Sequence, residues 1–319
     1  MSIGTRKRTL QSALVRIPPV VWALLAMVVF FARMDPRFLT LSNVANLFTQ
    51  GSILMILCMG VVVVSIAGGI ELSVGAVMTL AGMLMAWVLV NTGLPIALAL
   101  LVPLVVGALC GILNGIFVAR MNIPSFIATL GTQGMAIGLC LGMNKGNVIA
   151  GLPPAVGNIG GGSWLGVPVP IWVSVVAFAS SFILLRFTPF GLYVYAIGGN
   201  EQALKLTGRP SWWYKILTFV YAGLMAGLAA IIITSRNMTA QPTVGLGMEF
   251  EAFSGTVLGG CVAGRGGAVE TTLGVLFILV LRNGLNVMGV PTYYQLAIIG
   301  TALISAIVVS VVLEQRMAR

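Results

Sequence analysis

GSILMILCMGVVVVSIAGGIELSVGAVMTLAGMLMAWVLV, residues 51–90, decides the fold class of this chain. A helix needs about 20 apolar residues to cross a bilayer, and this run is long enough for two. The glycine pair Gly68-Gly69 divides it, because glycine can end a helix. We therefore predict two membrane-spanning helices, near residues 44–66 and 71–90, with Glu71 in the first turn of the second.

The whole chain has the same apolar character. Of its 319 residues 59% are hydrophobic and 8% are charged, with a mean hydropathy of +1.07, whereas soluble domains carry roughly 25% charged residues. The fold class that follows is an all-α polytopic membrane protein with about ten transmembrane helices. The span at 250–264 is short and rich in glycine, so eight or nine spans also fit the pattern. The ten spans are predicted near residues 17–34, 44–66, 71–90, 95–119, 125–143, 168–186, 213–235, 250–264, 269–288 and 293–313.

The basic residues indicate an orientation in the membrane. The net charge is +10, from 17 Lys and Arg against 7 Asp and Glu. With a cytoplasmic N-terminus, twelve of the basic residues fall on the cytoplasmic side and five on the other, as the positive-inside rule predicts. An even number of spans then places both termini in the cytoplasm. We expect residues 1–16 to form a basic cytoplasmic N-terminus, residues 17–319 to form one transmembrane domain, and the partner to be a lipid bilayer rather than nucleic acid.

Residues for catalysis or metal binding are few. The chain has no histidine, the residue type most used as a general base and as a metal ligand. Its four cysteines lie far apart in apolar runs, which is typical of buried apolar side chains: Cys58, Cys110, Cys140 and Cys261. The glycine-rich segment 259–267 holds one arginine, but the phosphate-binding pattern G-x-x-x-x-G-K-[ST] does not occur. We expect no catalytic residue, no metal site and no cofactor bound by this chain.

Polar residues within the apolar runs are candidates for a solute path. In GGIELSVG, residues 68–75, the glycines let backbone polar groups face a cavity, and a helix start would favour the carboxylate of Glu71. A capped helix start near the membrane surface is the alternative. Asparagines between membrane helices serve in packing or bind sugar hydroxyls. The candidate path residues are Gly69, Glu71, Ser73, Asn114, Asn283 and Asn286.

A polar insert, TPFGLYVYAIGGNEQALKLTG at residues 188–208, lies between two apolar runs. Asn200 is a good N-cap, and Gly208 suits the position just after the end of a helix, which is often glycine. This pattern predicts a short surface helix over residues 201–207 on the cytoplasmic side. Trp212 and Trp213 then mark the return to the membrane interface. The helix is either an amphipathic connection lying on the membrane or a docking element for another protein.

Four stretches of the sequence, in this order, resemble the permease subunit of ribose-type ABC sugar importers. They are GGIELSVG, NGIFVARMNIPSFIATLGT, TPFGLYVYAIGGN and GRGG followed by NGLN. The resemblance extends from roughly Phe38 to Ser305. Glu71 replaces the aspartate usual in the family, and Leu192 replaces its usual arginine.

The resemblance implies a type II-like ABC importer permease fold in the bacterial cytoplasmic (inner) membrane. It implies a second permease subunit, identical or paralogous, together with ATP-binding subunits and an extracytoplasmic sugar-binding protein. ATP hydrolysis would belong to those partners, so this chain would not be an enzyme. A coupling segment at about residues 187–212 would enter a groove of the ATPase, using Gly199, Asn200, Glu201, Gln202, Ala203, Lys205 and Leu206.

The cargo implied by the resemblance is a monosaccharide or a related small polyol-like solute, and the sugar itself stays open. A stand-alone secondary transporter or channel for a small polar solute is the alternative, because interrupted helices also occur in such proteins. An intramembrane enzyme would need a nucleophile and a base, and the sequence offers no plausible pair.

Overall fold

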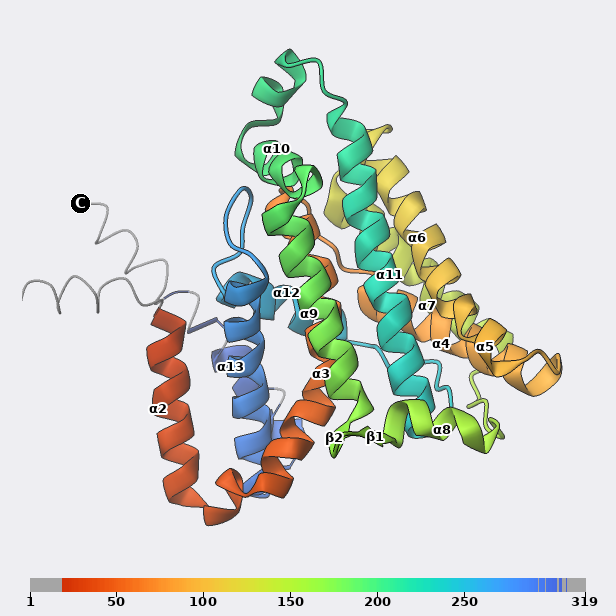
Figure 1. Cartoon of the computed structure of the whole chain (residues 1–319), viewed down its shortest axis with the longest axis vertical. Helices are drawn as coiled ribbons and strands as arrows, with labels where there is room; N and C mark the ends of the chain where they lie inside the picture. The colour runs from red at the N-terminus through yellow and green to blue at the C-terminus, as the bar shows by residue number, and fades with distance from the viewer. Residues whose placement is uncertain (1–18, 292, 296, 303, 306–307, 309–319) are drawn as a thin grey trace, which may run out of the picture. The chain divides into compact units, whose positions relative to one another are not determined.

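The computed structural model describes residues 19–291, 293–295, 297–302, 304–305 and 308. These residues are mainly helical, as the sequence predicts (Figure 1). They divide into two compact units, one made of Ala45–Val275 and the other of the segments up to Val44 and from Leu276 onward. The predicted basic segment 1–16 lies outside the described residues.

The elements follow one another in a simple order. The larger unit also holds a short antiparallel hairpin of two strands, β1 (Ser163–Trp164) and β2 (Val167–Pro168). The helices are α2 (Pro19–Met34), the 3-10 turn η1 (Pro36–Leu39), α3 (Leu41–Ile66), α4 (Val74–Asn91), α5 (Ile96–Ala99), α6 (Leu101–Ala119), α7 (Ser125–Met143), α8 (Pro154–Gly161), α9 (Val169–Phe187), α10 (Pro189–Leu206), α11 (Ser211–Asn237), α12 (Met248–Leu258) and α13 (Ala268–Val287).

Seven helical segments in the described part of the chain are long and apolar enough to cross a membrane. They are α3, α4, the segment Ile96–Ala119 that joins α5 to α6, α7, α9, α11 and α13. The described part of helix α2, Pro19–Met34, is apolar and has 16 residues, whereas a full span needs roughly 20; the residues before Pro19 lie outside the described part of the chain. Within the predicted span 293–313, every residue that the structure describes is helical. The remaining residues of that span lie outside the described part of the chain. The predicted count of about ten spans is therefore not confirmed.

The predicted span at 250–264 is wrong. Helix α12 ends at Leu258 after 11 residues, which gives it a length of about 16 Å, half of the roughly 30 Å hydrocarbon core of a bilayer. The glycines that follow account for the early end, because Gly260, Gly264 and Gly266 all have positive φ angles that a helix does not accept. The segment is a short helix followed by a glycine-rich turn.

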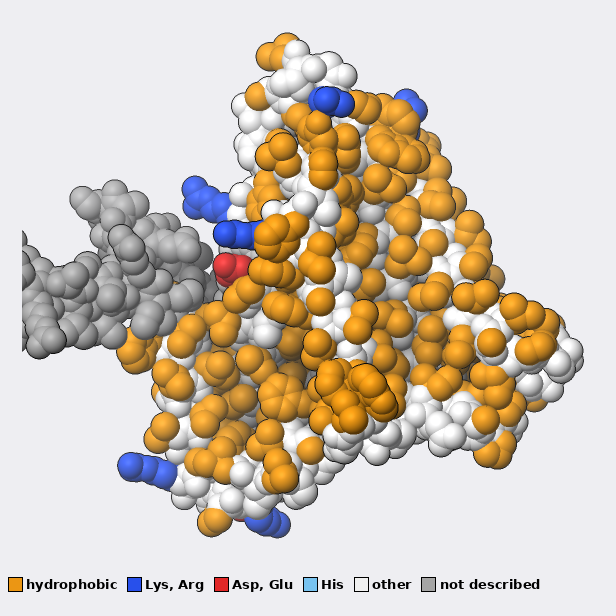
Figure 2. All heavy atoms as spheres, viewed as in Figure 1, with side chains coloured by type: hydrophobic (Ala, Val, Ile, Leu, Met, Phe, Trp, Pro, Cys, Tyr) orange, Lys and Arg blue, Asp and Glu red, His pale blue; other side chains and the backbone are white. Residues whose placement is uncertain are grey.

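Burial separates inner from outer helices in the larger unit. Helices α4 and α11 bury 72% and 67% of their most apolar stretch inside the protein, whereas α7 and α9 bury only 28% and 22%. Many large apolar side chains of α6, α7 and α9 are exposed. Figure 2 shows hydrophobic side chains over most of the visible surface, with few charges among them. Such a surface is what lipid-facing helices require.

Glycines allow α6 and α11 to pack closely. A Cβ atom added to Gly107 would strike the backbone of Gly223, and one added to Gly227 would strike the backbone of Pro103. Small residues at such contacts let membrane helices approach through their backbones. The contact runs along much of both helices, since Gly111 and Gly115 also face α11.

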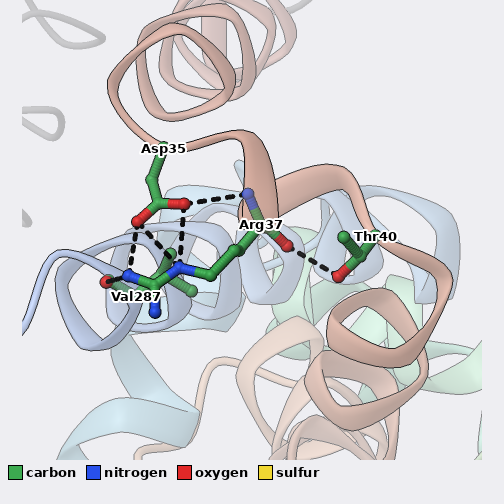
Figure 3. Close-up of polar contacts among 4 residues, drawn as sticks. All are labelled: Asp35, Arg37, Thr40 and Val287. Atoms are coloured by element: carbon green, nitrogen blue, oxygen red, sulfur yellow. Dashed lines mark hydrogen bonds and ion pairs between the residues drawn. The ribbon is translucent and has the colours of Figure 1, made fainter.

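The smaller unit is held together at the turn between α2 and α3. Asp35 caps η1 by accepting hydrogen bonds from Arg37, whose guanidinium also donates to the Val287 carbonyl at 3.3 Å (Figure 3). These hydrogen bonds from Arg37 lower the pKa of the Asp35 carboxyl below its ordinary value. Gly284 of α13 leaves room for the ring of Phe31. Arg37 therefore ties η1 to the end of α13.

Candidate functional site

Residues 67–73 form a non-helical connection between α3 and α4. Gly68 has φ +82°, a conformation that glycine adopts at little cost. The Ile66 carbonyl at the end of α3 accepts a hydrogen bond from the Gly264 amide at 2.8 Å, so the glycine-rich turn after α12 completes this helix end. The glycine break between the two helices is thus present where the sequence predicts it.

Glu71 lies before α4, not in its first turn as predicted. Helix α4 begins at Val74, and Ser73 is its N-cap residue. The reason is local, because the Glu71 carboxylate accepts hydrogen bonds from both the amide and the hydroxyl of Ser73, each at 2.6 Å. These bonds hold residues 71–73 in a turn that precedes the helix.

A buried polar network extends from Glu71 to two neighbouring helices. The side-chain amide of Asn114 on α6 donates to Glu71 Oε2 at 3.3 Å and to Ser73 Oγ at 3.0 Å. Asn114 Oδ1 accepts a hydrogen bond from Thr132 of α7 at 2.5 Å. All four side chains are buried. The network connects the helix break to α6 and α7, and it brings together three of the predicted path residues.

The network is closed to solvent, while the glycine break is not. Glu71, Ser73 and Asn114 line a crevice against α11 that is too small for a water molecule. Beside it, Gly68 and Gly69 line a separate cavity of about 270 Å³, together with Ser125, Lys215 and Phe219. Of the predicted path residues in this unit, Gly69 therefore faces open space and the others do not.

Asn283 and Asn286 belong to the smaller unit, where each has a partner. Asn283 and Asn43 exchange hydrogen bonds between their side-chain amides, at 2.8 and 3.0 Å. Asn286 Oδ1 accepts from the side chain of Gln295 at 2.8 Å. Both asparagines connect chain segments within this unit, which is the packing role that the sequence left open beside a role in sugar binding.

The sequence analysis missed a second buried acid, Glu249 in the first turn of α12. Its Oε1 accepts hydrogen bonds from the Gln133 side chain at 2.6 Å and from the Gly247 amide at 3.2 Å. Its Oε2 is buried and has no hydrogen-bond partner among the described residues. An acid beside an apolar run, in a chain with seven acids, was a usable signal, because ionisable groups at membrane depth are costly and usually functional.

Helices α4 and α12 meet at their starts. Thr79 Oγ1 of α4 accepts a hydrogen bond from the Gly245 amide at 3.0 Å. A Cβ atom added to Gly75 would strike both Glu249 Oε2 and the Gly245 carbonyl. Glu249 therefore sits against the first turn of α4.

The predicted surface helix is present at the end of α10. Asn200 has an extended backbone, φ −161° and ψ 91°, which kinks α10 at this point. Its side-chain oxygen accepts a hydrogen bond from the Ala203 amide at 3.0 Å, so it caps the helix that follows. Gly208 has φ +76° and ends it. The first part of α10, residues 189–199, is helical too, which the sequence analysis did not predict.

Glu201 faces the protein, unlike its neighbours. It accepts a hydrogen bond from Lys215 of α11 at 2.6 Å and one from the Ser211 hydroxyl at 3.0 Å, and Lys205 lies 3.3 Å away. Partial burial raises its pKa, but the hydrogen bond and charge of Lys215 outweigh this effect, so the pKa of Glu201 lies below its ordinary value. The other six predicted coupling residues are exposed: Gly199, Asn200, Gln202, Ala203, Lys205 and Leu206.

The first part of α10 is linked to the helix break through the glycine-rich turn. The Tyr195 hydroxyl donates to the Gly266 carbonyl at 2.6 Å. Gly198 lies so close to the Ile66 carbonyl and the Gly264 amide that a Cβ atom there would strike both. The kinked helix, the turn and the end of α3 are therefore in direct contact.

Comparison with known proteins connects this arrangement to transport. A protein-family profile described as "Branched-chain amino acid transport system / permease component" matches residues 43–307. The ribose import permease protein of Bacillus subtilis is 39% identical over 288 residues, covering 89% of each chain. The D-allose transport system permease protein of Escherichia coli is 32% identical over 283 residues, which are 88% of this chain and 87% of that protein.

A third relative is the L-arabinose ABC transporter permease protein of Azospirillum brasilense, 31% identical over 300 residues, which are 93% of this chain and 86% of that protein. No solved structure gives a significant match.

Proposed function

The chain belongs to the branched-chain amino acid transport system permease family, and on that premise we propose that it is the transmembrane subunit of an ATP-driven importer for a monosaccharide or a related small polyol-like solute. The observation that carries the proposal is the similarity to sugar permeases along nearly the whole chain. The three relatives are named for ribose, D-allose and L-arabinose. These solutes share a cluster of hydroxyl groups and differ in stereochemistry, so the class of cargo is better supported than its identity.

The energy for import would come from partner chains. The sequence has no G-x-x-x-x-G-K-[ST] phosphate-binding pattern, and the arabinose relative is named as part of an ABC transporter. The partners that fit are ATP-binding subunits, an extracytoplasmic sugar-binding protein and a second permease subunit, identical or paralogous. The assembly would lie in a bacterial cytoplasmic membrane with both termini of this chain in the cytoplasm.

The end of α10 is the proposed receiver of movement from the ATPase. Its outer surface presents Leu206, which is 90% exposed, while its inner surface is tied through Glu201 to Lys215 of α11. A displacement of this segment would therefore act on α11 directly. Helix α11 in turn packs on α6 through the backbone contact of Gly223 with Gly107, and α6 carries Asn114 of the Glu71 network.

A second connection runs from α10 to the helix break. The contact of Tyr195 with Gly266, and of Gly264 with Ile66, joins the helix to the residues just before Gly68 and Gly69. The closed Glu71 network and the neighbouring cavity would then be the two sides of a gate. An element with two discrete packings whose balance shifts with ATP binding is what such a switch requires.

The experiment is sugar uptake into proteoliposomes that contain this chain with its ATP-binding subunits and binding protein. We expect uptake of one or more monosaccharides that needs ATP and all components, and no uptake of branched-chain amino acids. Import by this chain alone, without ATP, would instead support the stand-alone transporter. Binding of sugars to the purified binding protein would identify the cargo.

A further inference from the structure

A second cavity of about 270 Å³ lies where the end of α6 meets the end of α10 and the start of α11. It has far more room than the roughly 15 Å³ that a single water molecule needs. Its lining includes three basic side chains and one acidic side chain, together with Asn122 and Trp212. The charged residues of the lining are Arg120, Lys205, Lys215 and Glu201.

The positive charge of this cavity is only partly neutralised. Glu201 accounts for one negative charge, which it shares between Lys215 at 2.6 Å and Lys205 at 3.3 Å. Three cations against one carboxylate leave an excess of two positive charges. An excess of this kind beside an open cavity favours an anionic ligand.

Arg120 carries donors that the described part of the chain leaves unused. Its guanidinium stacks on the ring of Trp212, with Cζ 3.4 Å from the ring centroid. Among the described residues it makes no hydrogen bond and no ion pair. The stacking fixes the plane of the guanidinium, and a planar guanidinium with free N–H groups matches the paired oxygens of a phosphate.

The surroundings of the cavity are those of a membrane surface. Ile116, Ile112 and Leu109 lie four, eight and eleven residues before Arg120, so they share its face of α6. All three are exposed, which provides an apolar strip that leads to Arg120. Trp213, beside Trp212, is 48% exposed, and tryptophan is enriched where the headgroups of a bilayer lie. In Figure 2, Lys and Arg side chains stand among hydrophobic ones at the end of the molecule where Figure 1 shows the end of α10 and the start of α11.

We propose that this cavity binds the phosphate of an anionic phospholipid, with the acyl chains along the exposed strip of α6. Arg120 provides paired hydrogen bonds, Lys205 and Lys215 provide charge, and Trp212 holds the guanidinium in place. Because Lys215 also pairs with Glu201, an occupied site competes for the bond that ties α10 to α11. The site shares Asn122 and Lys215 with the cavity beside Gly68 and Gly69, and its ligand does not depend on which solute is carried.

The test is a titration of the full-length chain in neutral detergent with phosphatidylglycerol or phosphatidylcholine, followed by native mass spectrometry. We expect tighter binding of phosphatidylglycerol, and Arg120→Gln should weaken it roughly fivefold, the effect of one basic residue near an anionic lipid. Phosphatidylcholine binding should not change. The proposal would be overturned if the unaltered chain and Arg120→Gln bound phosphatidylglycerol with equal affinity.

The matched control is Arg209→Gln. Arg209 lies in the same polar stretch and faces Tyr193 at 5.7 Å, but it is not part of the cavity lining. We expect this variant to bind phosphatidylglycerol as the unaltered chain does, and an equal loss in both variants would point to general surface charge instead. If Arg120→Gln does not yield a monodisperse protein, Lys205→Gln takes its place, since that side chain is half exposed.

Two further measurements separate a lipid site from a site for free phosphate and from a contact with another protein. Inorganic phosphate at millimolar concentration should not displace phosphatidylglycerol, and displacement would show that free phosphate is the ligand. Co-purification with the ATP-binding subunits should be unchanged in Arg120→Gln. Loss of those subunits together with unchanged lipid binding would show that the cavity is a contact for protein, and the lipid site would be wrong.

Discussion

Glu71 and Glu249 occupy similar places but have different surroundings. Each stands at the start of a helix, α4 or α12, and each is only 2% exposed. Both carboxylate oxygens of Glu71 accept hydrogen bonds, from Ser73 and Asn114. Glu249 uses one oxygen for Gln133 and Gly247, and its Oε2 is left without a hydrogen-bond partner in the described part of the chain.

This difference indicates two uses of a buried acid. A carboxylate with every oxygen bonded holds neighbouring segments in one arrangement, whereas a buried acceptor without a partner costs free energy in the folded state. The Glu71 network therefore stabilises one arrangement of the turn before α4 relative to α6 and α7. Glu249 keeps one oxygen without a hydrogen-bond partner in the described part of the chain, at the place where α4 and α12 meet, and ionisable groups at membrane depth are common in transport paths.

We expect the largest effect on stability from replacing Asn114, which lies at the centre of the Glu71 network. Asn114→Leu deletes the donor to Glu71 and Ser73 and the acceptor for Thr132. Each buried polar group left without a partner costs about 1–3 kcal/mol, so we expect a loss of about 3 kcal/mol in the free energy of unfolding. Thermal unfolding in detergent measures it.

The control for that variant is Asn91→Leu. Asn91 is exposed and donates only to the Trp87 carbonyl of its own helix, so its loss should change stability by no more than about 0.5 kcal/mol. Equal unfolding temperatures for the two variants would show that the Glu71 network adds no stability.

The same amide substitution at the two acids tests the comparison directly. In Glu71→Gln an amide nitrogen would face the donating amide of Asn114, and the charge that strengthens the bonds to Ser73 is lost, so we expect a cost of about 2 kcal/mol. In Glu249→Gln the new amide replaces the oxygen without a partner, close to the Gly245 carbonyl, and the cost should stay below about 0.5 kcal/mol. Thermal unfolding of both variants in one detergent shows which substitution costs more stability. A larger loss in Glu249→Gln than in Glu71→Gln would refute the difference drawn here between the two acids.

Much of the helical framework follows from sequence because the bilayer sets a length. The predicted spans 125–143 and 269–288 correspond to α7 (Ser125–Met143) and α13 (Ala268–Val287) within one residue at each end. The capping residues Asn200 and Gly208 were also predictable, since a cap acts through its own backbone neighbours. These features depend on local chemistry, which a single sequence displays.

Long-range pairing is what the sequence could not display. Glu249 and Gln133 are 116 residues apart, and no local pattern marks them as partners. Hydropathy also failed to separate α12, a short buried helix, from a complete span, because both are apolar. The inward direction of Glu201 was missed for the same reason, since its partner Lys215 belongs to the next helix. The path and coupling roles of the predicted residues stay predictions.

A partly exposed acid with several partners extends the comparison to the membrane surface. Glu201 pairs with Lys215 and Lys205 and bonds to Ser211, so Glu201→Gln should cost about 1 kcal/mol at neutral pH. The pKa of Glu201 is lowered from 4.5, so its contribution is fully present above that pH and is lost as the pH falls through the lowered pKa. Unfolding temperatures across this acidic range should decline more for the unaltered chain than for the variant. Parallel curves would show that Glu201 contributes no pH-dependent stability.

We expect the smallest effect on stability from Leu206→Asp, which introduces an acid at an exposed position. Leu206 is 90% exposed at the end of α10, so Leu206→Asp should change the free energy of unfolding by no more than about 0.5 kcal/mol. If the outer surface of this segment docks on an ATP-binding subunit, the same variant should lower ATP-dependent sugar uptake strongly, because a charge would enter a contact that holds an apolar side chain. Leu206→Met keeps that side chain apolar and should retain uptake. Full uptake by the aspartate variant would remove Leu206 from the coupling contact, and it would leave Glu201 as the residue through which α10 acts on α11.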